Sequence, residues 1–375
     1  MISCECAIIG AGFAGAATAY HLTQRGLTDI LLVEQESIPG FHSSGRNAAM
    51  IRQCVPDPAV ARLARDGAAF LRNFPSDWPV PVQFKPNGSL LLGKGDGWQK
   101  LKREGEEDRK LGINVEFWSP EQARKRVSVL DEADFDGAVW SDSDGIIDIH
   151  ALLSGYLKAA TAKGARVRYG MKVKSIERSS EGGFKLISDN DQIESMVIVN
   201  ATGAWANVVA RLAGAAELPL RPCRRHLFVS GPLQLVDPGW PFVWDVSHDI
   251  YFRPEGQGLL LCACDQSELP PGDPPVDPSM QEMLAEKIHR HIPGLASVSI
   301  SKSWAGIRTL TSDGRFIIGW DPEVEGFFWV AGLGGHGVTT SSAVGSVASE
   351  MILGVSKPEF EAFSPARFSQ GKDKP

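Results

Sequence analysis

The sequence predicts an α/β protein that is built on a parallel sheet with helices on both faces. Three apolar runs, at residues 7–9, 196–199 and 327–331, each lead into a turn of small residues, and helical patterns follow the first and the third turn. Strands that are buried on both faces read as continuous apolar runs. Because ligands bind at the carboxyl edge of such a sheet, we expect the three turns to meet around one large ligand.

The first turn carries the most specific motif of the chain. Residues 10–15 read G-x-G-x-x-G between an apolar run and a helical pattern at 16–25, and a second apolar run at 30–33 ends at Glu34. This order is that of a Rossmann-type dinucleotide-binding unit, in which the pyrophosphate lies at the helix N-terminus and the acid binds a ribose. Glu34 would repel a 2′-phosphate, which disfavours NADP. The alternative is a glycine turn that only packs.

Three further segments are expected to contact the same ligand. Small and hydroxyl-bearing residues dominate the segment 41–50, with a tightly packed helix start expected behind them, and residues 200–205 and 332–338 follow apolar strands. Because these turns come from remote parts of the chain, the ligand would be held by the whole domain, which favours FAD over a mobile nicotinamide cofactor. The predicted cofactor contacts are Gly10, Gly12, Phe13, Ala14, Gly15, Glu34, Gln35, His42, Ser43, Ser44, Arg46, Asn47, Ala48, Ala49, Met50, Val173, Ala201, Thr202, Gly203, Trp205, Gly332, Gly334, Gly335, His336, Gly337 and Val338.

The pattern of predicted elements changes along the chain from α/β to strand-rich and back, which predicts two interleaved domains. We expect a discontinuous FAD-binding domain at 1–80, 145–222 and 305–375, and an α+β substrate-binding domain with an antiparallel sheet at 81–144 and 223–304. Apolar residues at helical spacing predict helices at 57–73, 98–111, about 150–164 and 280–291. Ser119 followed by Pro120 predicts a helix start. Short apolar runs predict strands at 88–93, 137–140, 165–169, 173–176, 184–187, 226–229, 250–252 and 259–262.

Composition excludes several function classes. The 375 residues are 43% hydrophobic and 22% charged, with a net charge of −7 and no basic tract, so nucleic acid is not expected as a partner. Six cysteines include two C-x-C pairs, Cys4/Cys6 and Cys262/Cys264, which we interpret as small buried residues on strands. No metal-ligand spacing, disulfide framework, signal peptide or membrane-spanning apolar stretch is found, which predicts a cytoplasmic protein without a metal.

The motifs together resemble a known family. The glycine turn with Glu34, the segment 200–205 (Asn-Ala-Thr-Gly-Ala-Trp) and the segment 334–337 (Gly-Gly-His-Gly) are similar to those of the FAD-dependent D-amino-acid oxidase superfamily, which includes glycine and sarcosine oxidases and D-amino-acid dehydrogenases. Within that group the chain is most similar to bacterial D-arginine dehydrogenases. The stretches that carry this finer resemblance are 40–46, 224–225, 250–251, 304–308 and 327–331.

The resemblance implies roles for four residues. Tyr251 and Arg308 would hold the substrate carboxylate, with Arg225 near the same pocket. A guanidinium binds a carboxylate bidentately and a phenol donates one hydrogen bond, so the pair would fix the substrate Cα–H beside the flavin. His336 replaces an aromatic residue in the third glycine loop and either faces the flavin or substrate or packs. No cysteine lies at 332–342, the region of the covalent flavin link in monomeric sarcosine oxidases, which implies noncovalent FAD.

The chain departs from the D-arginine enzymes where they bind the substrate guanidinium. Residues 85–88 read Lys-Pro-Asn-Gly without an acid, and Met50 and Val55 replace pocket-lining His and Tyr residues. We therefore expect a different substrate, in a pocket lined by Met50, Phe242 and Trp244.

The resemblance implies oxidation of the C–N bond of a small amino acid or secondary amine, by hydride transfer from Cα to flavin N5 and hydrolysis of the resulting imine. Two alternatives remain at this stage: oxidation of a 2-hydroxy acid, and a flavin-bearing subunit of a larger dehydrogenase complex. Oxygen or a quinone as electron acceptor, and a peripheral membrane association, are left open.

Overall fold

A central sheet of eight strands forms one half of the molecule. The computed structural model describes residues 2–180 and 182–371. Strands β1, β2, β9, β12 and β20 are parallel, in the order β20-β12-β1-β2-β9, and β10, β11 and β19 extend the sheet in antiparallel pairs. The strands span Ile2–Ile9 (β1), Ile30–Val33 (β2), Arg166–Arg168 (β9), Ser175–Arg178 (β10), Phe184–Ile187 (β11), Gln192–Asn200 (β12), Ile317–Trp320 (β19) and Phe327–Ala331 (β20).

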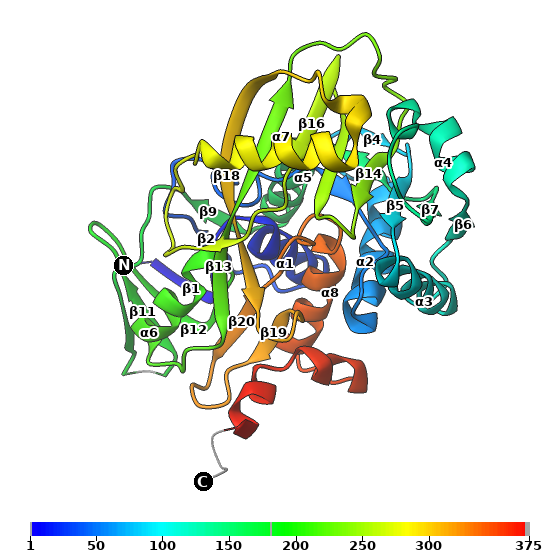
Figure 1. Cartoon of the computed structure of the whole chain (residues 1–375). Helices are drawn as coiled ribbons and strands as arrows, with labels where there is room; N and C mark the ends of the chain where they lie inside the picture. Colours follow the sequence, from blue (N-terminus) through cyan, green and yellow to red (C-terminus); the bar gives the residue numbers. More distant parts are fainter. Residues whose placement is uncertain (1, 181, 372–375) are drawn as a thin grey trace.

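Helices cover both faces of this sheet, as predicted. Helices α1 (Phe13–Gln24), α5 (Ile149–Ala162) and α8 (Ser341–Ile352) pack against one another in the larger apolar core, together with α2 (Pro58–Arg72) (Figure 1). Gly345 permits the closest approach, because a Cβ at that position would lie 2.5 Å from the backbone of Ala17. Helix α6 (Ala206–Ala213) covers the opposite face through a second core.

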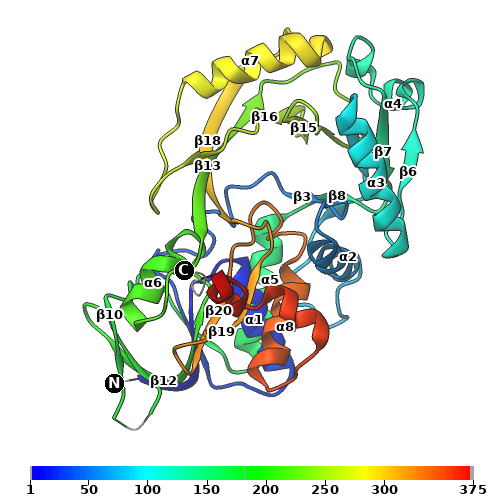
Figure 2. The ribbon, with the colours of Figure 1, turned by 60° about the horizontal axis from the view of Figure 1, so that its bottom comes forward.

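A second sheet of nine strands forms the other half of the molecule, and α7 (Ser279–His291) lies across its outer face (Figure 2). The sheet is antiparallel except for one parallel pair, β5 with β14. Helices α3 (Asp96–Lys110) and α4 (Pro120–Arg126) lie at the β6–β7 end. The strands span Ser89–Gly93 (β5), Glu116–Trp118 (β6), Gly137–Ser141 (β7), Leu220–Ser230 (β13), Phe242–Asp245 (β14), Ile250–Glu255 (β15), Gly258–Cys262 (β16), Ser267–Glu268 (β17) and Ile300–Thr311 (β18).

A small sheet of three strands joins the two halves. It contains β3 (Met50–Ile51), β4 (Phe84–Lys85) and β8 (Gly145–Ile147) in the order β3-β8-β4. Short 3-10 helices complete the described chain at Ser128–Leu130, Gly203–Trp205, Pro293–Leu295, Pro358–Phe363 and Pro365–Gly371. No helix in the described part of the chain is long and apolar enough to cross a membrane.

Most predicted elements are confirmed within a few residues, and two details are wrong. The segment after Asn47 does not start a helix; it becomes strand β3 because its backbone pairs with β8. Cys264 does not share a strand face with the buried Cys262, because β16 ends at Cys262 and Cys264 has a positive φ of 55°. Strands β13 and β18 cross the predicted domain boundaries near residues 222 and 304, so the division into two domains stays a prediction.

Asp144 fixes the loop that leads from β3 toward α2. Its buried carboxylate accepts hydrogen bonds from the backbone N–H and the side-chain amide of Gln53 (3.1 and 2.9 Å) and from the hydroxyl of Ser89 (2.7 Å). Burial raises the pKa of Asp144 to about 6, although these three hydrogen bonds oppose the shift. The carboxylate therefore ties the β3 segment to β5 in the second sheet.

Replacing this carboxylate is expected to destabilise the protein strongly. Asp144→Ala leaves three buried donors without an acceptor, and we expect it to lower the free energy of unfolding by about 3 kcal/mol or more. Urea denaturation of the purified protein measures the change. The matched control is the exposed Asp142→Ala, which bonds Asn114 at the surface and should cost less than about 1 kcal/mol. Equal losses in both variants would contradict the role given to Asp144.

Candidate active site

One large cavity opens along the carboxyl ends of the parallel strands. Adjacent strands β1, β12 and β20 end together at Ile9, Asn200 and Ala331, and the turns that follow them line the cavity, as the sequence predicts. The cavity continues between the two large sheets, where β13, β14, β15 and β18 contribute its far wall. It can therefore hold an elongated ligand with one end on the first sheet and the other beneath the second.

The glycine turn has the backbone geometry that its motif predicts. Gly10 has a φ of 103°, and a Cβ there would lie 2.6 Å from the carbonyl oxygen of Ala201 in the neighbouring turn. A Cβ at Gly15 would lie 1.9 Å from the Gly10 carbonyl oxygen, so Gly15 permits helix α1 to pack against the end of β1. Gly12 is the N-cap of α1 and offers no side-chain acceptor, which leaves N–H groups of the first turn directed at the cavity.

Segment 42–49 forms the side of the cavity that faces this helix end. Ser44 Oγ accepts a hydrogen bond from the Phe13 N–H (3.0 Å), which anchors the segment to the start of α1. The Asn47 amide donates to the Ser44 carbonyl (2.8 Å), and its oxygen accepts from the N–H of Ala49 (2.8 Å), whose φ is 57°. These bonds hold an alanine in a backbone conformation that it rarely adopts, with the backbone of the segment facing the cavity.

Glu34 ends β2 at the position predicted for a ribose-binding acid. One carboxylate oxygen accepts from the Ala11 N–H (2.9 Å) and the other from the Glu36 N–H (3.0 Å), which fixes the side chain at the cavity wall. Two nearby side chains are already bonded to acids: His42 to Glu36 (2.9 Å) and Arg46 to Asp273. Glu34 is the one carboxylate among the described residues that line the cavity.

The structure brings nearly all predicted site residues together. Every predicted cofactor-contact residue lines the cavity except Gly15, which packs behind the turn, and the four predicted substrate-side residues line it as well. Phe242 was expected in the pocket, and this is wrong: it shares a face of β14 with Trp244 but is fully buried in the core and does not line the cavity. Trp244 does line the cavity and lies opposite Tyr251 on the neighbouring strand, with ring centroids 5.0 Å apart.

Tyr251 and Arg308 lie at the end of the cavity beneath the second sheet. Burial raises the pKa of Tyr251 well above its ordinary value, so its hydroxyl stays protonated and can donate a hydrogen bond. Arg308 lies on β18 and reaches the third glycine turn, where a Cβ at Gly335 would be 2.6 Å from its Nη1. Its guanidinium makes no hydrogen bond or ion pair with any described residue. The pair thus presents a phenol and an unpaired cation to the cavity.

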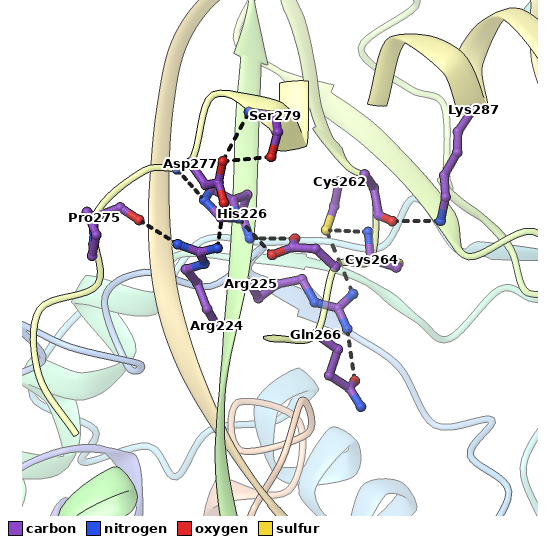
Figure 3. Close-up of polar contacts among 12 residues, drawn as sticks. Arg224, Arg225, His226, Cys262, Cys264, Gln266, Pro275, Asp277, Ser279 and Lys287 are labelled. Carbon is purple, nitrogen blue, oxygen red and sulfur yellow. Dashed lines mark hydrogen bonds and ion pairs between the residues drawn. The ribbon is translucent and has the colours of Figure 1, made fainter. Parts of the chain in front are cut away.

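Arg225 differs from Arg308 because its guanidinium is hydrogen-bonded to other side chains of the protein. Figure 3 shows its guanidinium between Cys262 and Gln266, with Nη1 3.9 Å from the Cys262 sulfur and Nη2 3.3 Å from the Gln266 side-chain oxygen. The same sulfur accepts from the Cys264 N–H (3.3 Å). Although burial opposes the shift, Cys264 and then the Arg225 charge lower the pKa of Cys262 to about 6. Cys262 thereby offsets part of the Arg225 charge behind the cavity wall.

His336 lies in the third glycine turn and lines the cavity. Burial, and after it the charges of Arg52 and Arg308, hold the pKa of His336 well below its usual range. The imidazole is therefore neutral at physiological pH and is a weak base.

The sequence interpretation missed Arg52. It follows β3, its backbone N–H donates to Thr339 Oγ1 (3.0 Å), and its guanidinium carbon lies 4.3 Å from the centre of the Trp244 ring. The side chain lines the same cavity as Arg308. No local motif marks it, because the pocket wall at this point is formed by β3 and β14, which are nearly two hundred residues apart in the chain.

The fold and the site together define an oxidoreductase that binds a dinucleotide across the end of a parallel sheet. The model of the DAO family of FAD dependent oxidoreductases matches residues 5–351, and the chain belongs to this family. It is therefore an FAD-dependent enzyme.

Relatives and solved structures agree with this assignment. FAD-dependent oxidoreductase domain-containing protein 1 of Bos taurus is 28% identical over 92% of this chain and 80% of its own length. Mitochondrial sarcosine dehydrogenase of Mus musculus is 24% identical over 95% of this chain and 40% of its own length. The fold is similar to that of L-proline dehydrogenase from P. horikoshii (TM-score 0.88, 24% identity) and glycine oxidase from Geobacillus kaustophilus (TM-score 0.84, 22% identity), each over 100% of both chains.

The residues present fit FAD. The corner formed by Gly10 and Gly12 leaves a backbone cradle that a Cβ would fill, since at Gly12 it would lie 2.9 Å from Ser44 Oγ. Such a cradle at a helix N-terminus whose N-cap residue, Gly12, has no side-chain acceptor suits a pyrophosphate, and the carboxylate of Glu34 directly after β2 suits a ribose. The turns at 200–205 and 332–338 continue the cavity toward Tyr251 and Arg308, where the flavin would lie.

Proposed function

We propose that the protein oxidises the C–N bond of an amino acid or secondary amine, with noncovalent FAD as its cofactor. FAD supplies the two-electron acceptor of this chemistry when bound. The observation that carries the proposal is the unpaired guanidinium of Arg308 beside the protonated hydroxyl of Tyr251, at the end of the FAD cavity. A half-buried cation without an anionic partner is costly, and a bound substrate carboxylate would supply that partner.

Tyr251 and Arg308 would orient the substrate. A bidentate bond to Arg308 and one hydrogen bond from Tyr251 fix a carboxylate at three points, which also fixes the direction of the adjacent Cα–H bond. Arg225 is proposed to support this end of the pocket through its charge, held in place by Cys262 and Gln266. Orientation of the Cα–H toward the cofactor is then the main contribution of the protein to the rate.

No described residue at this end of the cavity is a strong base. His336, the one candidate from the sequence, is held neutral with a low pKa and would gain a proton only in acid. A substrate amine must therefore give its proton to solvent before its C–N bond is oxidised. The imine product would then leave the site and hydrolyse in water.

Several similar proteins carry names that agree with an amino-acid or secondary-amine substrate, namely sarcosine dehydrogenase, glycine oxidase and L-proline dehydrogenase. Although the sequence resembles D-arginine dehydrogenases, we do not propose D-arginine as the substrate. A guanidinium side chain needs an acid, and the substrate end of the cavity has Arg52, Arg225 and Arg308 instead.

A 2-hydroxy acid is the second candidate, because it carries the same carboxylate. L-alpha-glycerophosphate oxidase from Mycoplasma pneumoniae has the same fold, with a TM-score of 0.82 and 19% identity. The same fold therefore occurs in an enzyme named for an alcohol phosphate as well as in enzymes named for amines or amino acids.

Anaerobic reduction of the bound flavin tests the choice directly. We expect amino acids or secondary amines, offered as glycine, sarcosine, proline and both enantiomers of glutamate and alanine, to bleach the flavin absorption of the holoprotein. The matched 2-hydroxy acids, glycolate, lactate and 2-hydroxyglutarate, should leave it unchanged. Bleaching by hydroxy acids alone would overturn the C–N assignment. Bleaching by amines only after a partner chain is added would assign the protein as a subunit of a larger complex.

The neutral state of His336 also predicts the pH dependence. The protonated amine predominates below the pKa of the substrate amine, so kcat/KM should rise by about tenfold per pH unit up to that pKa. Because the His336 pKa lies well below 6.5, no inflection from this residue should appear between pH 6 and 8. His336→Gln should therefore retain the shape of the profile. A neutral-pH inflection in the wild-type protein that disappears in the variant would show that His336 is the base.

A further inference from the structure

The substrate end of the cavity carries a second unpaired cation in addition to Arg308. We propose that Arg52 binds a second carboxylate of the substrate, so that the substrate is a dicarboxylate, an acidic amino acid or an imino-diacid. This inference rests on the proposed function for the reaction type, and on the cavity itself for the second anion.

The guanidinium of Arg52 and the ring of Tyr251 both contact the indole of Trp244 in the cavity wall. The Arg52 guanidinium carbon is 4.3 Å from the Trp244 ring centre, and that ring lies 5.0 Å from the Tyr251 ring. Trp244 therefore connects Arg52 to the predicted carboxylate clamp along the cavity wall. Both Arg52 and Arg308 are close enough to His336 to lower its pKa, which places the two cations around the same turn.

No described residue satisfies the Arg52 guanidinium. It makes no hydrogen bond and no ion pair with the described part of the chain, and it stacks on the indole of Trp244. Burial lowers the pKa of Arg52. Arg253, by comparison, is also buried but bonds the carbonyls of Ala48 and Pro254 and pairs with Glu255.

The acidic side chains near Arg52 interact with other groups and not with its guanidinium. Asp144 affects the Arg52 charge, but its oxygens accept from Gln53 and Ser89. Asp108 is buried next to Cys54, and its pKa is raised to about 7, chiefly by burial, so it carries only part of a negative charge at neutral pH. Neither carboxylate lies within ion-pair distance of Arg52, so the open side of the guanidinium faces the cavity.

Charge balance then favours a dianion over a monoanion. Arg225 is partly offset by Cys262, whereas Arg52 and Arg308 are not offset by any carboxylate lining their end of the cavity. A substrate with one carboxylate would pair Arg308 and leave Arg52 desolvated and unpaired, which is unfavourable. A second carboxylate on the substrate side chain or nitrogen substituent would pair both cations.

Ligand binding to the holoprotein tests this without turnover. The probes are two pairs of non-oxidisable acids, succinate with succinamate and glutarate with glutaramate, which differ by one carboxylate replaced with an amide. Perturbation of the flavin absorption gives each dissociation constant. We expect at least one diacid to bind about 10- to 100-fold more tightly than its monoamide, the range of one charge-assisted hydrogen-bonded contact.

Substitution of Arg52 should remove this preference. In Arg52→Gln the diacid-to-monoamide ratio should fall to about one, and Arg52→Lys, which keeps the charge, should retain a ratio above that of the glutamine variant. The matched control is Arg62→Gln, which removes an exposed arginine on α2 and should keep the wild-type ratio. Equal affinities within both pairs in the wild-type protein, or a ratio that Arg52→Gln leaves unchanged, would overturn the second carboxylate site.

The ligand titration and the flavin-bleaching assay together separate this inference from the proposed reaction. If the flavin is bleached only by 2-hydroxyglutarate while the diacid preference depends on Arg52, the C–N assignment fails and the dicarboxylate site stands. If amines bleach the flavin but monoamides bind as tightly as diacids, the reaction stands and the second site fails.

Discussion

The site depends on one constraint, the close approach of three backbone turns where β1, β12 and β20 end side by side. Gly10 lies so near the carbonyl of Ala201 that no Cβ fits, and Gly15 must lack one for α1 to start immediately behind the turn. These contacts fix where the helix N-terminus points and how wide the cavity is. The cofactor site and the central sheet are therefore parts of the same packing arrangement.

The second sheet adds a different kind of constraint, which is electrostatic. It carries Arg225, Tyr251 and Arg308 over the carboxyl edge of the first sheet, and the small β3 sheet adds Arg52 from the side. The described carboxylates neutralise little of this charge within the cavity, although Arg46, which also lines the cavity, is paired with Asp273. Cations left unpaired in a half-buried site lower stability, so their retention is best explained by an anionic ligand.

Much of the cofactor site could be predicted from the sequence, because the glycine turn after β1 is a local feature. The glycine spacing, the apolar strand and Glu34 are all within thirty-five residues, and each restricts the backbone in a way that sequence alone reveals. The second and third turns follow the same rule, and their meeting point follows from the parallel topology. Arg308 and Tyr251 could be placed only through resemblance to a family, since an arginine on a strand has many structural uses.

What could not be predicted depends on contacts between distant segments. Arg52 becomes a pocket residue only because β3 pairs with β8 and brings it against Trp244. Phe242 lies outside the pocket because it is buried at the start of β14, next to Ser89 of β5, whereas Trp244 on the same face reaches the cavity. The end of β16 at Cys262, and not its apolar pattern, separates the environments of Cys262 and Cys264.

The most direct test of the central claim is the visible spectrum of the purified protein during titration with acetate, a carboxylate that cannot be oxidised. The account predicts one releasable flavin per chain and a saturable shift of its absorption band, which Arg308→Met weakens by about tenfold or more. A colourless protein that does not take up FAD, or a shift of equal affinity in Arg308→Met, would contradict the claim that the FAD cavity ends at an anion-binding arginine.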